Sequence, residues 1–409
     1  MKAEDIRYVN DKQMADTLLK HRDVKRVNQI IQRQEEDGPL GTRRRLLATS
    51  VRLSRSMAPD IHKMADECVE TLGMEIPLEL YVYSSPQFNA ACFKPEDGQL
   101  FVMFSSSLLE AFEGSELKFV VGHEFGHHVY RHHDIPIGYL LRGQNRPDAR
   151  LALDLFTWSR NAEISADRAG AICANDLDGV AKSLFKLASG LGDKVINFNL
   201  DEFLKQVDEM QIEDAEPGQG APKEDWFSTH PFSPLRVRAL KLFHESELMV
   251  TDGQSADDLE VGVQRLMSLM EPSYLEARTD AASSMRHVLF AGAIAVADST
   301  GGISSEEIEV FEKYFGKGEF NKGLDIERIK QDLSSRISRA LEHASETQRM
   351  QVVRDLCVVA KASGKVEDSE YRLLEDICDG LKISRSFICQ TFDQDIDPDE
   401  TMRCEHRQR

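Results

Sequence analysis

Two histidines and a glutamate stand at a spacing that can build a zinc site. They lie in the segment ELKFVVGHEFGHHVYRHHD, residues 116–134, as the HExxH pattern His123, Glu124 and His127. Residues four apart share one face of a helix, so both imidazoles can direct a ring nitrogen at one metal ion. Glu124 is offset by one residue and can reach a water on that metal, as a general base must. HExxH alone is weak support, because it arises by chance in on the order of a few per cent of such chains.

A catalytic zinc also needs a third protein ligand and an open coordination position. The segment SRNAEISADRAGA supplies Glu163 and Asp167, which are four residues apart and so share a helix face. We predict that Glu163 is the third ligand. We predict that Asp167 accepts the free N–H of a ligating histidine and thereby fixes its tautomer. The alternative is an ordinary Glu/Asp pair on a helix surface.

Other polar residues are candidates for supporting roles. A zinc hydrolase of this kind must stabilise an oxyanion, and His230 in the segment STHP and Arg236 in the following helix are the candidates for this. The alternative for His230 is that it only caps or packs at the helix start. For His128, His132 and His133 we expect a solvated face or incidental metal binding.

The elements that must position these residues can be read from the sequence pattern. Residues 57–72 have apolar positions close to a 3.6-residue period and are followed by Gly73, which predicts a helix. The segments 78–85 and 99–106 are predicted as strands, with a turn at Pro95, Asp97 and Gly98 between them. Helices are predicted from Ser115 through the HExxH, over 150–174 and over 233–247. The fold class is therefore α+β and mainly α, with a small β-sheet.

The chain is predicted to contain two domains. Residues 1–250 form the first, with a helical part at 1–75 and the candidate site at 76–250. The segment 212–225 is rich in Pro, Gly and acidic residues and is predicted to be a mobile loop or linker. Residues 251–258 form a linker, and 259–409 form an all-helical domain. This domain contains an internal repeat, with copies that begin at Ala293 and Leu356.

Composition excludes several classes of protein. The 409 residues carry a formal net charge of -20, which argues against a nucleic-acid binder. No segment approaches the roughly 20 apolar residues of a membrane span, and no signal peptide is visible. The seven cysteines form no CxxC pair, which is typical of reduced thiols and predicts a cytoplasmic location without cysteine zinc ligands.

Three linked segments resemble a known family. VVGHEFGH, SRNAEISADRAGA and STHPFSPLRVRAL occur in the order and at spacings similar to those of the zinc metallopeptidases that include HtpX and the CaaX prenyl endopeptidase, in the gluzincin group. The resemblance covers about residues 1–250 and implies the zinc ligands, the base, the supporting aspartate and the downstream pair already named. It also implies that Asn89 and Ala90, in SSPQFNAACF, belong to an edge strand near the substrate. The sequence departs from the family pattern after these two residues and at Phe232, where a proline is common.

The C-terminal repeat is similar to the helical TerB domain of tellurite resistance. That resemblance implies an accessory module that binds a protein partner, a membrane surface or metal, and the alternative is a plain helical bundle. Many relatives of the first domain have transmembrane helices, and this sequence shows none, so processing of prenylated proteins within a membrane is not expected.

We therefore predict a hydrolase, a zinc-dependent endopeptidase with one Zn²⁺ per chain that cleaves extended or unfolded proteins. Glu124 would activate the attacking water. One alternative is a latent or inactive zinc-domain scaffold whose C-terminal domain binds a partner. Another is a histidine-rich metal-handling protein, which would bind several metal ions and hydrolyse nothing.

Overall fold

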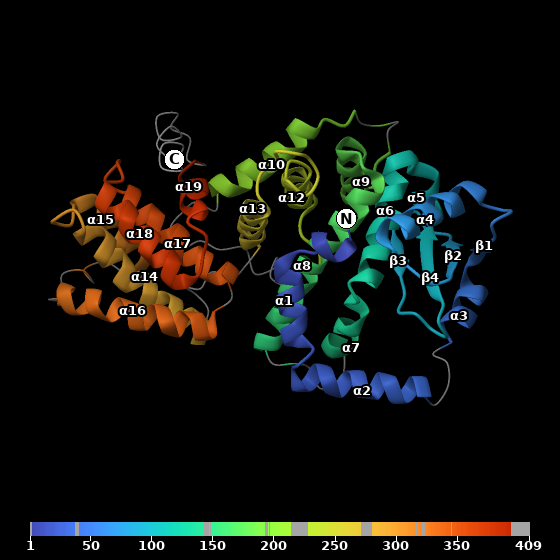
Figure 1. Cartoon of the computed structure of the whole chain (residues 1–409), viewed down its shortest axis with the longest axis horizontal. Helices are drawn as coiled ribbons and strands as arrows, with labels where there is room; N and C mark the ends of the chain where they lie inside the picture. The colour runs from blue at the N-terminus through green and yellow to red at the C-terminus, as the bar shows by residue number, and fades with distance from the viewer. Residues whose placement is uncertain are drawn as a thin grey trace. The chain divides into compact units, whose positions relative to one another are not determined.

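The computed structural model describes residues 2–393 apart from 37–40, 143–146, 148, 193–194, 196, 214–227, 271–279, 316–317, 319, 321–323 and 345. The chain divides into two compact units (Figure 1): Met1–Asp208 with Phe227–Ala256, and Asp257–Arg409 with Glu209–Trp226. Helices predominate, and the described strands form one four-stranded sheet, which confirms the predicted α+β, mainly α class. The loop predicted at 212–225 lies almost entirely outside the described residues.

The first unit begins with short helices, continues into the sheet and ends in longer helices. From the N-terminus through the sheet, the elements are η1 (Ala3–Ile6), α1 (Val9–Leu18), α2 (Arg22–Glu36), α3 (Thr42–Thr49), β1 (Val51–Leu53), α4 (Pro59–Leu72), β2 (Leu78–Tyr83), β3 (Ala90–Cys92), β4 (Leu100–Ser105) and α5 (Ser106–Ala111). The later elements are α6 (Gly114–Val129), η2 (His132–Asp134), α7 (Ile137–Arg142), α8 (Ala149–Ala174), α9 (Leu177–Ser189), α10 (Leu200–Glu213) and α12 (Ser233–His244). The last residues of α10, from Glu209 on, are assigned to the second unit. None of the described helices combines the length and apolar content needed to cross a membrane.

The sheet has the strand order β1-β2-β4-β3, so β3 is an edge strand. β4 is central and almost fully buried, which accounts for its apolar sequence LFVMFS. β2 runs parallel to β4, whereas β3 runs antiparallel to it. The predicted turn therefore joins β3 to β4 and not β2 to β4. There Asp97 and Gly98 have φ angles of 53° and 70°, as a tight hairpin turn requires. The sequence pattern did not predict β1, which has only three residues, whereas the family resemblance implied an edge strand at Asn89 and Ala90, and β3 occupies the edge from Ala90 onward.

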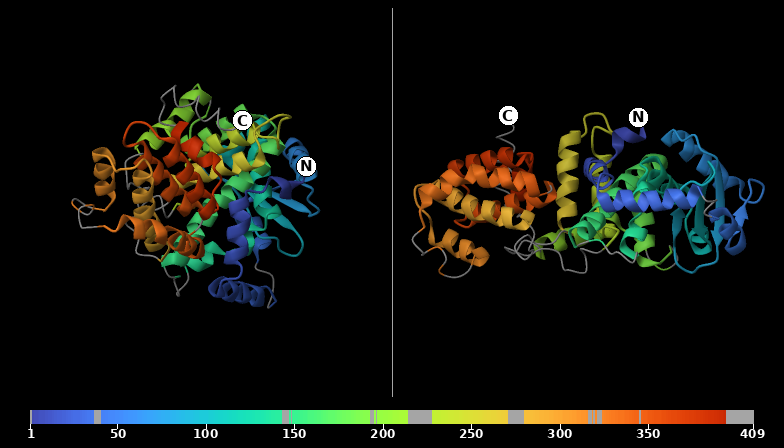
Figure 2. Two further views of the ribbon diagram at one scale, coloured as in Figure 1. Left: turned by 60° about the vertical axis from the view of Figure 1, so that its left-hand side comes forward. Right: turned by 90° about the horizontal axis from the view of Figure 1, so that it is seen from below.

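Two long helices, α6 and α8, pack against each other within the first unit (Figure 1 and Figure 2). β3 and α4 also contact α6, and α1 lies along α8. Glu113 occupies the N-cap of α6 in place of the predicted Ser115, whose hydroxyl instead donates to Asp176 at 2.7 Å. The helix ends at Val129, before residues 132 and 133, because Arg131 adopts a left-handed φ of 59°.

The second unit is all helical in its described part. Its helices are α13 (Ala256–Ser268, which starts at the division), α14 (Asp280–Asp298), α15 (Ser305–Phe315), α16 (Ile326–His343), α17 (Glu346–Lys361), α18 (Asp368–Leu381) and α19 (Ser386–Asp393). One apolar core joins α14, α17 and α18. The two copies of the predicted repeat correspond to α14–α15 and to α17–α18. Glu307 and Glu370, 63 residues apart, each accept the backbone N–H three residues earlier at 2.7 Å.

Candidate metal centre

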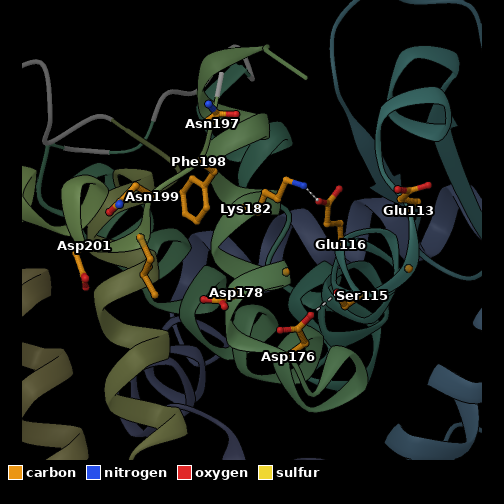
Figure 3. A pocket seen from close by; sticks show the side chains of 13 residues that line it. Glu113, Ser115, Glu116, Asp176, Asp178, Lys182, Asn197, Phe198, Asn199 and Asp201 are labelled. Atoms are coloured by element: carbon orange, nitrogen blue, oxygen red, sulfur yellow. Dashed lines mark hydrogen bonds and ion pairs between the residues drawn. The ribbon is translucent and has the colours of Figure 1, made fainter. Parts of the chain in front are cut away.

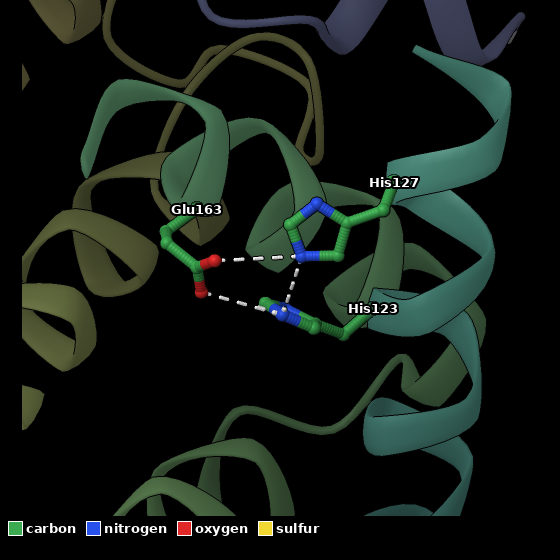
Figure 4. Close-up of side chains that lie close together, drawn as sticks. All are labelled: His123, His127 and Glu163. Carbon is green, nitrogen blue, oxygen red and sulfur yellow. Dashed lines mark hydrogen bonds and ion pairs between the residues drawn. The ribbon is translucent and has the colours of Figure 1, made fainter. Parts of the chain in front are cut away.

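Three side chains from two helices converge on one point. His123 and His127 project from α6, and Glu163 projects from α8 (Figure 4). The Nε2 atoms of the two histidines lie 3.2 Å apart. Oε2 of Glu163 lies 3.4 Å from Nε2 of His123, and Oε1 lies 3.4 Å from Nε2 of His127. One ligand atom from each of the three residues falls within 4.8 Å of the others. The predicted ligand set is thus brought together by the fold.

Small residues allow the two helices to approach closely enough. A Cβ atom at Gly126 would lie 2.9 Å from Cβ of Ala169 and 3.0 Å from Cα of Ala166. At Gly170, on the facing helix, a Cβ would lie 2.6 Å from the backbone oxygen of Phe119. Helix α8 thus occupies the space that a side chain at position 126 would need.

The chemistry of these residues fits a zinc ion. Two imidazole nitrogens and a carboxylate form the His2Glu donor set of catalytic zinc sites. Glu163 Oε2 is buried and accepts no well-aligned hydrogen bond from the described residues, so it retains an electron pair directed at the cluster. Glu163 is 5% exposed and His123 is 8% exposed, so a cation here would be largely shielded from bulk water.

Asp167 and Arg236 support one of the two histidines. Asp167 Oδ1 lies 3.0 Å from His123 Nδ1, as predicted for the residue that orients this ring. Arg236 donates to both oxygens of Asp167, at 2.8 and 2.6 Å. Burial alone would raise the pKa of Asp167, but the Arg236 guanidinium holds it below its usual range. Asp167 therefore stays ionised and accepts Nδ1–H, so Nε2 is the ring nitrogen of His123 that faces the cluster.

These contacts change the interpretation of Arg236. Its side chain is 9% exposed and also lies 3.3 Å from Glu163 Oε2, so its guanidinium is directed at two carboxylates. This arrangement favours a positioning role over the oxyanion contact that the sequence suggested. His230, in contrast, is 62% exposed with Nε2 3.5 Å from Glu163 Oε1, so its ring borders the centre and faces solvent. The oxyanion role stays a prediction for His230.

Glu124 connects the centre to the edge of the sheet. Its carboxylate accepts the backbone N–H of Cys92, in β3, at 2.7 Å. Burial raises the pKa of Glu124, an effect that His123 opposes. A raised carboxyl pKa suits a general base, because proton transfer is most efficient when the pKa lies near the working pH.

The two residues predicted to bind substrate differ in their availability. The backbone of Asn89 is bonded to Ser105, the last residue of β4. Its carbonyl oxygen accepts from the Ser105 N–H at 2.9 Å, and its N–H donates to Ser105 Oγ at 3.1 Å. Residues alternate along a strand, so the backbone groups of Ala90 point away from β4, toward the free edge. Ala90, but not Asn89, thus presents a backbone that can pair with another strand.

The remaining histidines do not form the solvated face that the sequence suggested. His132 is 6% exposed and is therefore buried, and His128 and His133 are half-buried. Nδ1 of His132 lies 2.8 Å from Nδ1 of His127. No sequence pattern signals this contact, because it depends on the left-handed turn at Arg131.

A cavity of about 890 Å³ lies elsewhere in the first unit, at the N-terminal ends of α6 and α9 (Figure 3). Its lining includes Glu116, whose carboxylate contacts Lys182 at 3.1 Å, and Asp176. None of the residues of the metal centre lines this cavity, so it is not the cleft that serves the centre.

Comparison with known proteins agrees with this geometry. The pattern of peptidase family M48 matches residues 55–142 and 148–243, and that of the tellurite resistance protein TerB matches 286–390. The chain therefore carries an M48 peptidase domain followed by a TerB domain. The M48 domain includes every candidate residue of the site: the HExxH, Glu163, Asp167, His230 and Arg236.

Two curated proteins are similar to the chain in the region of the M48 domain. The plastoglobule-localized metallopeptidase 48 of the Arabidopsis thaliana chloroplast is 31% identical over 205 residues, which is 47% of this chain and 59% of that protein. The protease HtpX homolog of Helicobacter pylori is 22% identical over 216 residues, which is 44% of this chain and 66% of that protein. The match thus covers less than two thirds of either relative. No solved structure matches the chain.

Proposed function

We propose that this protein is a zinc-dependent endopeptidase. The observation that carries the proposal is the convergence of His123, His127 and Glu163, with the Glu124 carboxylate beside them and the edge strand β3 within hydrogen-bond reach of it. The M48 domain and its metallopeptidase relatives support the same conclusion. One Zn²⁺ per chain is expected, because the described residues contain one cluster of this kind.

Each residue has a defined task in this reaction. The three ligands hold the zinc ion, which when bound supplies Lewis-acid polarisation of the scissile carbonyl and a more acidic water. Glu124 removes the proton from the attacking water and delivers it to the leaving amine. His230 presents its exposed ring as a donor to the developing oxyanion. Asp167 and Arg236 keep the His123 ring in place.

We propose extended polypeptide as the substrate. The free edge of β3 offers the backbone groups of Ala90, and an added strand that pairs there runs past Glu124, which is bonded to Cys92 in the same strand. Only a segment without its own secondary structure can pair in this way, which favours unfolded or loosely folded proteins. The TerB domain is proposed as an accessory module for a partner, and the cytoplasmic location stays a prediction.

Cleavage of an unfolded protein by the zinc-loaded full-length chain tests the proposal. Glu124→Gln is expected to bind zinc normally and to lose about 10²–10⁴-fold in rate, because only the proton transfer is removed. Glu110→Gln, at an exposed position of α5, is the matched control and retains activity. Cleavage by Glu124→Gln at the wild-type rate contradicts the proposal. Failure of the wild type to cleave supports the alternative of a latent scaffold.

A further inference from the structure

A chain of hydrogen bonds leads from the second zinc ligand to the N-terminal helix. Nδ1 of His127 lies 2.8 Å from Nδ1 of His132, and Nε2 of His132 lies 3.1 Å from Oδ2 of Asp11. Asp11 belongs to α1 (Val9–Leu18), and the match to the M48 family begins only at residue 55. The N-terminal segment thus contacts the candidate metal centre through a single intermediate residue.

Asp11 is held as a carboxylate by its surroundings. It is fully buried and accepts hydrogen bonds from Ser165 Oγ at 2.7 Å, Arg7 Nε at 2.8 Å and Trp158 Nε1 at 3.0 Å. Burial alone would raise the pKa of Asp11, but the hydrogen bond from His132 and the contact with Arg7 hold it well below its usual range. A buried carboxylate with these donors acts only as an acceptor.

With a neutral His132 ring, this acceptor fixes the direction of both hydrogen bonds that link Asp11 to His127. Because Asp11 can only accept, Nε2 of His132 must carry a hydrogen. In the neutral ring, Nδ1 of His132 is then a free acceptor, and Nδ1 of His127 donates to it. Nε2 of His127 is consequently unprotonated, as a zinc ligand must be. The opposite direction would place a hydrogen on Nε2 of His127 and block metal binding.

We propose that Asp11 and His132 are positioning residues of the zinc centre, and that helix α1 is a structural part of it. They fix His127 as an Nδ1–H donor with a free Nε2, as Asp167 does for His123 on the other side of the cluster. The inference rests on the proposed zinc site. Its further support is that Asp11 also bonds Ser165 and Trp158 on α8, the helix that carries Glu163.

Zinc affinity, measured by competition with a chromophoric chelator on the full-length chain, tests this inference without reference to protease activity. His132→Phe retains an aromatic ring against Tyr130 and Trp158 but has no acceptor, so the zinc dissociation constant is expected to rise about 10–100-fold. In His132→Asn the amide oxygen can replace Nδ1 as the acceptor, so this variant is expected to recover most of the affinity. His128→Phe, on the same helix as the ligands, is the matched control and binds zinc as the wild type does.

Imidazole ¹⁵N spectra of the wild type give a second readout that needs no variant to fold. We expect His132 to carry its hydrogen on Nε2 and His127 to carry its hydrogen on Nδ1. A hydrogen on Nδ1 of His132, or unchanged zinc affinity in folded His132→Phe, overturns the inference and leaves the proposed function intact. A wild type that binds no zinc overturns both together.

Discussion

Close packing between α6 and α8 makes Gly126→Ala the most informative single substitution. The added Cβ would lie 2.9 Å from Cβ of Ala169 and 3.0 Å from Cα of Ala166, and the latter belongs to the backbone of α8. Carbon atoms in ordinary contact are about 3.5–4.0 Å apart, so the helices must separate locally by roughly 0.5–1 Å. No flexible side chain is available to absorb this shift.

The shift affects the metal centre more than it affects stability. Overpacking costs about 1–3 kcal/mol, and the better helix propensity of alanine returns about 1 kcal/mol, so the net loss is about 0–2 kcal/mol. His127 follows Gly126 directly, and its partner Glu163 is one turn from Ala166 on α8. A displacement of about 1 Å can cost about 10²-fold in rate, so we expect a loss of that order in kcat/KM.

Three measurements on one preparation separate these effects: the thermal midpoint, the zinc dissociation constant and kcat/KM on an unfolded protein. Gly138→Ala is the matched control, because Gly138 is exposed in α7 and an added Cβ meets no atom within 4 Å. We expect the control to be unchanged or slightly more stable. Wild-type zinc affinity and kcat/KM in Gly126→Ala would refute the reasoning that this helix contact sets the ligand geometry.

Three further predictions concern charge and metal. Arg236→Met leaves the buried Asp167 without its cationic partner, with only His123 beside it, and is expected to cost about 3–5 kcal/mol in denaturant unfolding. Arg238→Met, on the same helix, loses an ion pair near the surface and is expected to cost less than about 1 kcal/mol. Burial and the neighbouring Glu307 raise the pKa of Glu370 to about 7 from 4.5. Between these two pKa values the folded second unit binds more protons than the unfolded chain. Its free energy of unfolding therefore falls by on the order of 1–3 kcal/mol as the pH rises from 4.5 to about 7. Glu370→Gln should raise the thermal midpoint of that unit at about pH 8 but not at about pH 4, and equal effects at both values would contradict the assignment. Removing zinc with a chelator should lower the midpoint of the first unit only, since zinc at 100 times its dissociation constant contributes about 2.7 kcal/mol to the bound domain, and adding zinc back should restore it.

The sequence by itself determined the parts of the site that depend on local spacing. Two histidines four residues apart on a helix must share a face, so His123 and His127 could be paired without a structure. Glu163 and Asp167 could be paired in the same way, and the repeat of the second unit was visible from its 63-residue offset. The apolar pattern also predicted α4 and its end at Gly73, which adopts the left-handed conformation in the structure.

Contacts between distant segments were decided only by the tertiary structure. Arg236 could be chosen as a candidate from the sequence, but whether its guanidinium faced the substrate or Asp167 depended on how α12 lies against α8. The parallel pairing of β2 with β4 depended on the order of strands, which a short apolar run does not specify. His132 and Asp11 are 121 residues apart in the sequence and meet for two reasons. The left-handed turn at Arg131 places η2 against α6, and α1 packs on α8. Periodicity shows only which face of a helix or strand a residue occupies. The packing of the whole unit decides which other helix or strand that face contacts.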